Sequence, residues 1–322
     1  LARGEANAPA LEMRKWFDTN YHYLVPEFTP ETSFQAGELP LFAELAQARA
    51  LGHQVKPVLL GPISYLWLGK SKGIESLSLL PALLAVYEQW LVRLQQWGCS
   101  WVQIDEPVLT LDLPLVWQQA LASAYQRLAV QAPRLLLATY FGSVAAHLPW
   151  LRELPLAGIH LDVVRAPEQL ATALREWPSE KVLSLGVIDG RNIWKTDLNV
   201  RLTQLQPLLA QRGDTLWLSA SCSLLHVPCD LQQETHLEAD IRSWLAFARQ
   251  KVEELSCLAR GLTEGIGAIA EAFSANAAAC AARRQSVRIH RPEVAARVAA
   301  ILPQAAQHVP LLQAASALNK PV

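Results

Sequence analysis

The stretch "SLSLLPALLAVYEQWLVRLQQWGCSWVQIDEP" (76–107) joins a long amphipathic segment to a short apolar one, and this junction decides the predicted fold. Apolar side chains recur at helical spacing as far as Gly98, a typical helix stop. "SWVQIDEP" (100–107) then has the pattern of a buried strand that ends in carboxylates. A helix that leads directly into a buried strand is the repeating unit of parallel α/β sheets.

The same alternation extends along most of the chain. Strand patterns occupy residues 55–63, 100–107, 134–142, 158–164, 181–190 and 215–223. Helical patterns lie around them at residues 38–52, 76–97, 115–130, 143–153, 167–176 and 197–212. Repeated units of this kind predict a parallel sheet with right-handed crossovers, and its commonest closed form is the (β/α)8 TIM-type barrel. Because only six strands can be counted, we expect an incomplete barrel with about six of the eight strands.

The segments at the two ends of this pattern differ from it. Residues 1–14 are predicted to be a leader or linker, and residues 15–231 the partial barrel, with an inserted hairpin at 15–35. Residues 232–303 are predicted to be a helical segment that packs on the barrel. Within it, 234–262 has the pattern of one long helix ended by Gly261. Residues 304–322 are predicted to be a linker toward a further domain.

The composition excludes several classes of protein. Of the 322 residues, 51% are hydrophobic and 18% charged, and the net charge is −1, so nothing indicates binding to nucleic acid or to an anionic membrane. No apolar run reaches about 18 residues and no secretory signal is present, which predicts a cytoplasmic location. Five irregularly spaced cysteines are a poor disulfide framework.

Polar residues gather where the predicted strands end, which is where (β/α)8 barrels carry their chemistry. Asp105 and Glu106 end one strand, and adjacent strand residues point to opposite faces. We therefore expect one of the two carboxylates to face the barrel mouth, where it can bind a substrate amine. The other is expected to cap a helix or to form an ion pair. Asp105 is the candidate binding residue. The alternative is that such residues only cap helices and satisfy loop backbone.

Cys222, His226 and Cys229 lie within eight residues of one another and suggest a zinc site. Local zinc knuckles usually pair with a second knuckle, however, and Cys99, Cys257 and Cys280 are single and lie in or beside helical patterns. The spacing therefore favours a small buried thiol and two loop residues over a metal site, and it assigns no role to His226 or Cys229.

Several long motifs together resemble one family, and the resemblance runs along nearly the whole chain. The family is cobalamin-independent methionine synthase, in its N-terminal half. The motifs are "MRKWFDTNYHYLVPEF" (13–28), "VKPVLLGPISYLWLGK" (55–70), "WVQIDEPVL" (101–109), "LATYFG" (137–142), "GVIDGRNIWKTDL" (186–198), "LWLSASCSLLHVPCDLQQET" (216–235), "WLAFARQKVEEL" (244–255) and "ARRQSVRIHRPEV" (282–294).

The resemblance implies a parent enzyme of two barrels on one monomeric chain. Its C-terminal barrel carries a zinc ion, uses no cobalamin, and binds homocysteine. There the thiolate attacks the N5-methyl group of 5-methyltetrahydropteroyltriglutamate. The N-terminal barrel contributes to the folate site and supports the catalytic barrel. On this comparison, two barrel strands lie upstream of residue 1 and the catalytic barrel lies downstream of residue 322.

The resemblance also assigns individual positions. Lys15 stands where the family has a lysine that contacts the folate polyglutamate, and an ammonium suits a tail of carboxylates. Ala138 and Tyr140 fall where the zinc barrel has its His-x-Cys ligands, while Asp162 lies near the position of a glutamate ligand. Cys222 occupies the position of the remaining cysteine. Two ligands do not hold zinc tightly, so Asp162 and Cys222 are expected to be relics of duplication, with no metal and no catalytic residue in this chain.

Four hypotheses follow for the function. In the first, the chain is part of a methionine synthase and is inactive when isolated. In the second, it is a non-catalytic module that binds folate or docks a separately encoded catalytic half. In the third, it is a decayed, truncated product. A self-contained barrel of the related decarboxylase group is the fourth, and the long motif match argues against it.

Overall fold

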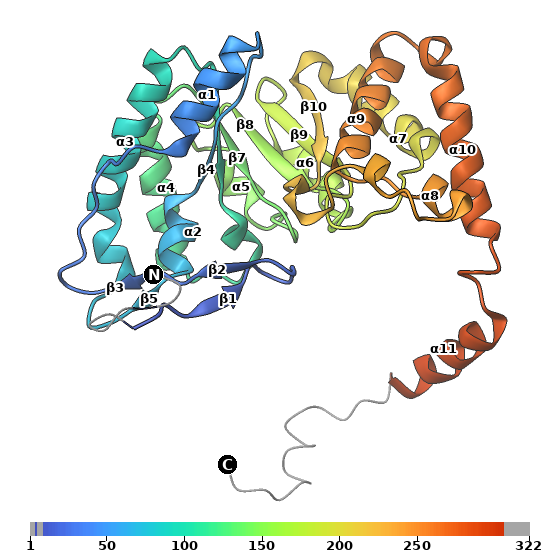
Figure 1. Ribbon diagram of the computed structural model, residues 1–322. Helices are drawn as coiled ribbons and strands as arrows, with labels where there is room; N and C mark the ends of the chain where they lie inside the picture. Colours follow the sequence, from blue (N-terminus) through green and yellow to red (C-terminus); the bar gives the residue numbers. More distant parts are fainter. Residues whose placement is uncertain (1–3, 5–8, 306–322) are drawn as a thin grey trace, which may run out of the picture.

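A computed structural model describes residues 4 and 9–305 of the chain (Figure 1). At its centre lies a parallel sheet of six strands in the order β10-β9-β8-β7-β6-β4. Its members are β4 (Val58–Leu60), β6 (Trp101–Asp105), β7 (Arg134–Ala138), β8 (Gly158–Asp162), β9 (Val182–Ile188) and β10 (Leu216–Ala220). Each of the six predicted strand segments contains one of these strands, with shorter bounds than predicted.

Helices follow the strands and pack around the sheet (Figure 1). They are α1 (Pro40–Ala50), α2 (Pro62–Trp67), α3 (Leu80–Gln96), α4 (Leu115–Leu128), α5 (Leu148–Leu151), α6 (Gln169–Glu176) and α7 (Leu198–Arg212). Short 3₁₀ turns are η1 (Ser76–Leu79), η2 (Pro107–Thr110), η3 (Gly213–Thr215), η4 (Leu224–His226), η5 (Leu231–Gln233) and η6 (Ile266–Ile269). The helix predicted at 143–153 is wrong in length, because only the four residues of α5 are helical. Gly98 does end the α3 segment, with φ at +72°.

The sheet is strongly rolled. The rings of Trp101 on β6 and Trp217 on β10 lie 4.7 Å apart, although three strands separate β6 from β10 in the sheet. In a flat sheet the two strands would be roughly 19 Å apart, at about 4.8 Å per step. The roll gives the sheet a concave inner face, and on β6 this face carries Trp101, Gln103 and Asp105, while Val102 and Ile104 are fully buried on the other face.

The expectation of a barrel is met only in part. Among the described residues β10 and β4 are the two edges of the sheet, and no backbone ladder joins them. A closed eight-stranded barrel is therefore not found. What the structure contains is an open, rolled, six-stranded parallel sheet covered by helices, consistent with about six strands of the predicted fold.

The predicted hairpin is present, with different bounds. β1 (Met13–Lys15) pairs antiparallel with β2 (His22–Leu24), so Lys15 lies opposite His22. β3 (Glu27–Phe28) then pairs in parallel with β5 (Lys70–Ser71). The hairpin therefore begins before residue 15 and ends at residue 24, and does not extend to 35. It lies at one end of the central sheet (Figure 1).

The single helix predicted at 234–262 is wrong. It is two helices, α8 (Ala239–Trp244) and α9 (Ala248–Thr263). Between them Leu245 forms a β-bridge with Trp194. Because the backbone of Leu245 pairs with the loop after β9, it cannot also form the hydrogen bonds of a continuous helix. Gly261 does not end α9 either, because it lies inside the helix, where an added Cβ would come within 2.8 Å of Ile269 Cδ1.

The last two described helices differ from each other in packing. α10 (Ala270–Gln285) buries Phe273, Asn276 and Cys280. α11 (Pro292–Ala305) lies away from the body of the molecule, and the described part of its surface is exposed (Figure 1). The predicted packing of 232–303 on the barrel therefore does not extend to α11. The linker predicted at 304–322 lies almost wholly outside the described residues.

One described segment, Ser76–Gln96, is long and apolar enough to span a membrane by length and composition alone. Within it, α3 buries Leu83, Leu84, Leu91 and Leu94 in the main core cluster. The segment is accounted for as a core helix.

Replacing Gly61 probes how closely the residues before α2 pack against the end of β6. A Cβ at this position would lie 2.0 Å from Cδ of Glu106, a fully buried side chain. We expect Gly61→Ala to lower the free energy of unfolding by about 1–3 kcal/mol, the usual cost of overpacking. Urea denaturation of both proteins measures this change. Gly37→Ala is the matched control, since nothing lies within 4 Å of its added Cβ; equal stability losses would contradict the prediction.

Candidate functional site

A cavity of about 360 Å³, lined by both polar and apolar side chains, lies on the concave face, toward the carboxyl ends of the strands. Its lining includes Gln103, Asp105, Tyr140, His160, Ser219, Cys222 and Ser223. Asp105 is the central charged group. Its carboxylate accepts hydrogen bonds from Gln103 Nε2 at 2.8 Å and from Tyr140 Oη at 3.1 Å. Burial raises the pKa of Asp105 to about 6, against the opposing effect of these bonds.

His160 lines the same cavity as a neutral side chain. Its Nδ1 lies 3.0 Å from Ser184 Oγ, and its Nε2 lies 3.4 Å from the carbonyl oxygen of Ser221. Burial lowers the pKa of the imidazole to about 4, so His160 is uncharged at neutral pH. The cavity therefore offers one carboxyl group together with neutral hydroxyl, amide and imidazole groups.

Glu106 takes the opposite side of β6, as the alternation of strand residues requires. Its carboxylate accepts hydrogen bonds from the backbone amides of Ile63 and Ser64 in the first turn of α2, at 3.2 and 2.7 Å. Ser64 Oγ and Tyr125 Oη donate two more. Burial raises the pKa of Glu106 to about 7. Glu106 therefore joins β6 to α2 and α4, and only Asp105 of this pair lines the cavity.

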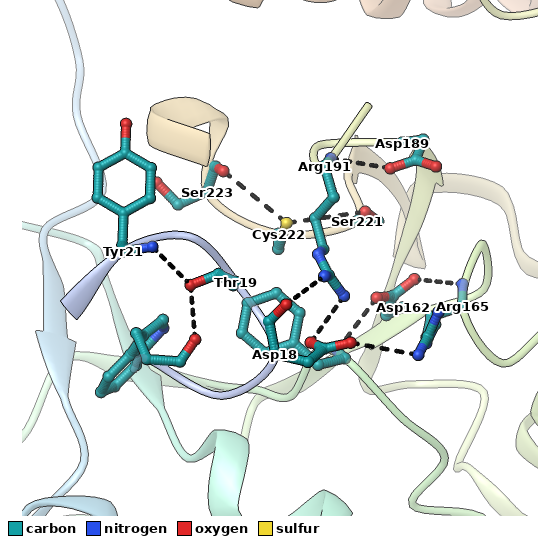
Figure 2. Close-up of polar contacts among 12 residues, drawn as sticks. Asp18, Thr19, Tyr21, Asp162, Arg165, Asp189, Arg191, Ser221, Cys222 and Ser223 are labelled. Atoms are coloured by element: carbon teal, nitrogen blue, oxygen red, sulfur yellow. Dashed lines mark hydrogen bonds and ion pairs between the residues drawn. The ribbon is translucent and has the colours of Figure 1, made fainter. Parts of the chain in front are cut away.

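The tip of the β1–β2 hairpin lies against the loops that follow the strands (Figure 2). Arg191 Nη1 lies 2.8 Å from Asp18 Oδ1, and Arg165 Nη2 donates to Asp18 Oδ2 at 3.3 Å. The rings of Phe17 and Phe141 are 5.5 Å apart. Lys15 is exposed on the same hairpin, so the structure places it on the hairpin surface and Asp105 inside the cavity.

The residues expected to be relics of a zinc site do not fit zinc. Asp162 accepts three backbone hydrogen bonds, from the amides of Phe141, Val164 and Arg165, and so organises two loops. Burial raises the pKa of the Cys222 thiol to about 12, which disfavours the thiolate that zinc requires. Among the described residues no group of three or more His, Cys, Asp or Glu side chains could hold a metal ion.

The Cys222, His226 and Cys229 side chains have different environments. The His226 ring packs against the rings of Tyr21 and Phe141, at 5.2 and 5.6 Å. Cys222 is buried, whereas Cys229 is exposed. The spacing that suggested a metal site therefore produces no shared site.

Sequence patterns missed the contacts of the hairpin tip. Asp18 and Arg165 are 147 residues apart, and Asp18 and Arg191 are 173 apart. No periodicity or short motif links such distant positions. The backbone conformation of Phe17, with φ at +51°, has no signal in the sequence either.

Enzymes built on parallel α/β sheets bind small molecules in cavities at the carboxyl ends of the strands, where a few polar groups orient the ligand. Comparison with known proteins identifies the family. The family described as "Cobalamin-independent synthase, N-terminal domain" matches residues 1–213. The chain therefore belongs to the cobalamin-independent methionine synthase family, a family of methyltransferases.

Two curated relatives are 5-methyltetrahydropteroyltriglutamate–homocysteine methyltransferases. The one from Acidithiobacillus ferrooxidans is 48% identical over 92% of this chain, and the one from Burkholderia thailandensis is 50% identical over 93%. The chain spans 42% and 40% of their respective lengths. A solved B12-independent methionine synthase from Shewanella sp. W3-18-1, in complex with selenomethionine, has a similar fold. Its TM-score is 0.59 at 17% identity, covering 80% of this chain and 75% of that one.

The burial of the His160 imidazole predicts how the stability of the fold depends on pH. Its pKa is about 4 in the folded chain against 6.5 for the free side chain, so the unfolded chain binds a proton first as the pH falls. The stability that depends on neutral His160 is present in full above pH 6.5 and is lost as the pH falls toward 4. An NMR titration of the His160 ring protons should show a midpoint near pH 4. A midpoint near 6.5 would show that the imidazole is not desolvated.

The donor set predicts the metal content of the purified chain. We expect protein prepared under reducing conditions to hold much less than one zinc per chain, because the Cys222 thiol stays protonated and Asp162 is already satisfied. Elemental analysis of the wild-type chain and of Cys222→Ser measures this. One zinc per wild-type chain, lost in the variant, would contradict the analysis of this site.

Proposed function

We propose that the chain acts as the N-terminal part of a methionine synthase. The parent reaction is methyl transfer from 5-methyltetrahydropteroyltri-L-glutamate to L-homocysteine, giving L-methionine. The observation that carries the proposal is the match of about half identity over more than nine tenths of the chain to enzymes with this name. In this proposal the chain contributes folate contacts and supports a catalytic C-terminal barrel, in a cytoplasmic, monomeric parent enzyme.

Lys15 is the proposed contact for the polyglutamate tail. It is the last residue of β1 and is exposed, next to the tip of the hairpin. Its charge is therefore accessible to a flexible, multiply charged ligand. A tail of several carboxylates gains more from such a charge than a single glutamate does.

Asp105 is the second proposed binding residue. It is the only carboxylate among the residues that line the described cavity, and its hydrogen-bond partners there are the neutral side chains of Gln103 and Tyr140. Lys56 donates to Gln103 Oε1 from outside this lining, and its charge favours the ionised form of Asp105. A ligand ammonium would add an opposite charge inside the cavity itself. No step of methyl transfer is assigned to Asp105.

Zinc belongs to the catalytic barrel in this proposal, since the described residues of this chain do not fit it. When bound there, zinc lowers the pKa of a substrate thiol and makes it nucleophilic. The role of this chain is to hold the folate, and we propose that it forms no methionine alone.

Replacing Lys15 tests the folate contact. Fluorescence titration of the full chain with 5-methyltetrahydropteroyltriglutamate should give a dissociation constant about two- to fivefold higher for Lys15→Ala, as expected for one exposed ion pair. The loss should shrink for the monoglutamate and at high salt. Arg175→Ala is the control: this exposed residue near the end of α6 pairs with Glu176 and lies beside Pro178 and Ser179, which lead into the amino end of β9. Equal effects of Lys15→Ala on both ligands would argue against the tail contact.

The alternative is a non-catalytic module that acts with a separately encoded catalytic half. The chain can be mixed with the catalytic barrel of the Acidithiobacillus relative, and methionine formation measured. Activity that needs both components supports the division of labour proposed here. Methionine made by this chain alone would refute it. A decayed product predicts no folate binding and no activity in the mixture.

A further inference from the structure

We propose that Asp18 clamps the hairpin tip onto the loops after β8 and β9, and in this way positions Lys15 for the folate tail. The hairpin clamp is defined as Asp18, Arg165 and Arg191. Asp18 is a positioning residue in this proposal, because it acts through Lys15. The positioning of Lys15 rests on the proposed function, whereas the clamp itself does not.

The carboxylate of Asp18 is shared between two arginines (Figure 2). Its Oδ1 lies 2.8 Å from Arg191 Nη1, and its Oδ2 accepts from Arg165 Nη2 at 3.3 Å. Arg191 Nη2 also donates to the backbone carbonyl of Asp18 at 3.0 Å. A planar guanidinium that binds both the side chain and the backbone of one residue fixes the orientation of that residue. The tip is thus tied to the loops after two different strands.

Aromatic contacts surround the clamp. Arg191 lies over the ring of Phe141 at 5.2 Å, and Phe141 in turn packs against Phe17. On the other side of the tip, Tyr21 packs against His226 at 5.2 Å. The side chains of Asp18 and Arg165 are 52% and 58% exposed, whereas that of Arg191 is 24% exposed, so the pair with Arg191 is the better protected of the two.

Hydrogen bonds within the hairpin connect the tip to Lys15. Thr19 is buried, and its Oγ1 donates to the carbonyl of Trp16 at 2.6 Å while its amide donates to the same oxygen. The amide of Trp16 donates to the carbonyl of Tyr21 at 2.7 Å. Lys15 is paired with His22 directly beneath this loop. A displacement of the tip therefore displaces Lys15.

The hairpin has a second anchor at its other end. Tyr23 Oη donates to the carbonyl of Leu68 at 3.1 Å, and Val25 and Phe28 are buried beyond it. Without the ion pairs, the tip would be held only by the aromatic contacts of Phe17 and Tyr21, which have no fixed direction of bonding. The hairpin clamp adds directional bonds at the tip, far from the anchor at Tyr23, so the two ends of the hairpin are fixed separately.

Backbone conformation at the aromatic contact indicates that the tip is held from outside. Phe17 and Phe141 have φ angles of +51° and +77°, and among the described residues they are the only ones besides glycine with positive φ. They touch each other. Unfavourable conformations of this kind persist only where surrounding contacts hold them.

Hydrogen–deuterium exchange of the unliganded full chain tests the clamp without reference to folate. We expect Asp18→Ala and Asp18→Asn to speed exchange of the amides in residues 15–24 by about tenfold, as local opening becomes easier, and to leave the central sheet unchanged. Asp18→Glu, which keeps the charge, should restore part of the protection. Arg165→Gln should have a smaller effect, because the bonds from Arg191 remain. Asp214→Ala is the control, since Asp214 is exposed at the amino end of β10.

The same variants are then titrated with 5-methyltetrahydropteroyltriglutamate. We expect Asp18→Ala to weaken binding about as much as Lys15→Ala, and the double variant to be no weaker than either. Unchanged exchange in both Asp18→Ala and Asp18→Asn overturns the clamp. Faster exchange with unaltered triglutamate binding overturns the positioning of Lys15. If Lys15→Ala itself has no effect while exchange is faster in the Asp18 variants, the clamp stands and the folate proposal fails.

Discussion

Two consecutive carboxylates at the end of β6 are held on opposite faces of the sheet, and both the cavity and the helical layer depend on that separation. Glu106 enters the helical side and accepts the first amides of α2, so α2 begins where this carboxylate lies. Asp105 enters the concave side and takes hydrogen bonds from Gln103 and Tyr140. A shift of one residue in the pairing of β6 would exchange the two environments.

The roll of the sheet brings other side chains close to Asp105 on the concave face. Because β6 and β10 approach one another across the concave face, residues from strands far apart in the sheet line one cavity with Asp105. Gly186 on β9 contributes by having no side chain, since a Cβ there would lie 2.5 Å from Ser221 Cα and 3.1 Å from His160 Cε1. The close approach of the strand ends therefore depends on the absence of one methyl group.

Much of this architecture could be predicted from the sequence, for reasons that are local. Apolar runs bounded by Gly, Pro and Asp indicated all six strands, and the two-residue period placed Asp105 and Glu106 on opposite faces. The prediction of one long helix was wrong, and the zinc-like spacing was uninformative, because long-range contacts decide the structure there. The bridge between Leu245 and Trp194 divides a helix that local propensity would leave continuous. The aromatic partners of His226 come from the hairpin and from the loop after β7, so the Cys-x3-His-x2-Cys spacing indicated nothing about its surroundings.

The distance in sequence between the hairpin and its partners has a consequence for biosynthesis. Asp18 leaves the ribosome 173 residues before Arg191. At about 5–20 residues per second, roughly 10–35 s pass before the second arginine is even synthesised. For most of that interval Phe17 lacks its ring partner Phe141, which precedes Arg191 in the chain. Tyr21 lacks His226 throughout, because His226 follows Arg191. Docking of the hairpin tip is therefore a late event in cotranslational folding, and the rings of Phe17 and Tyr21 wait for it in the nascent chain.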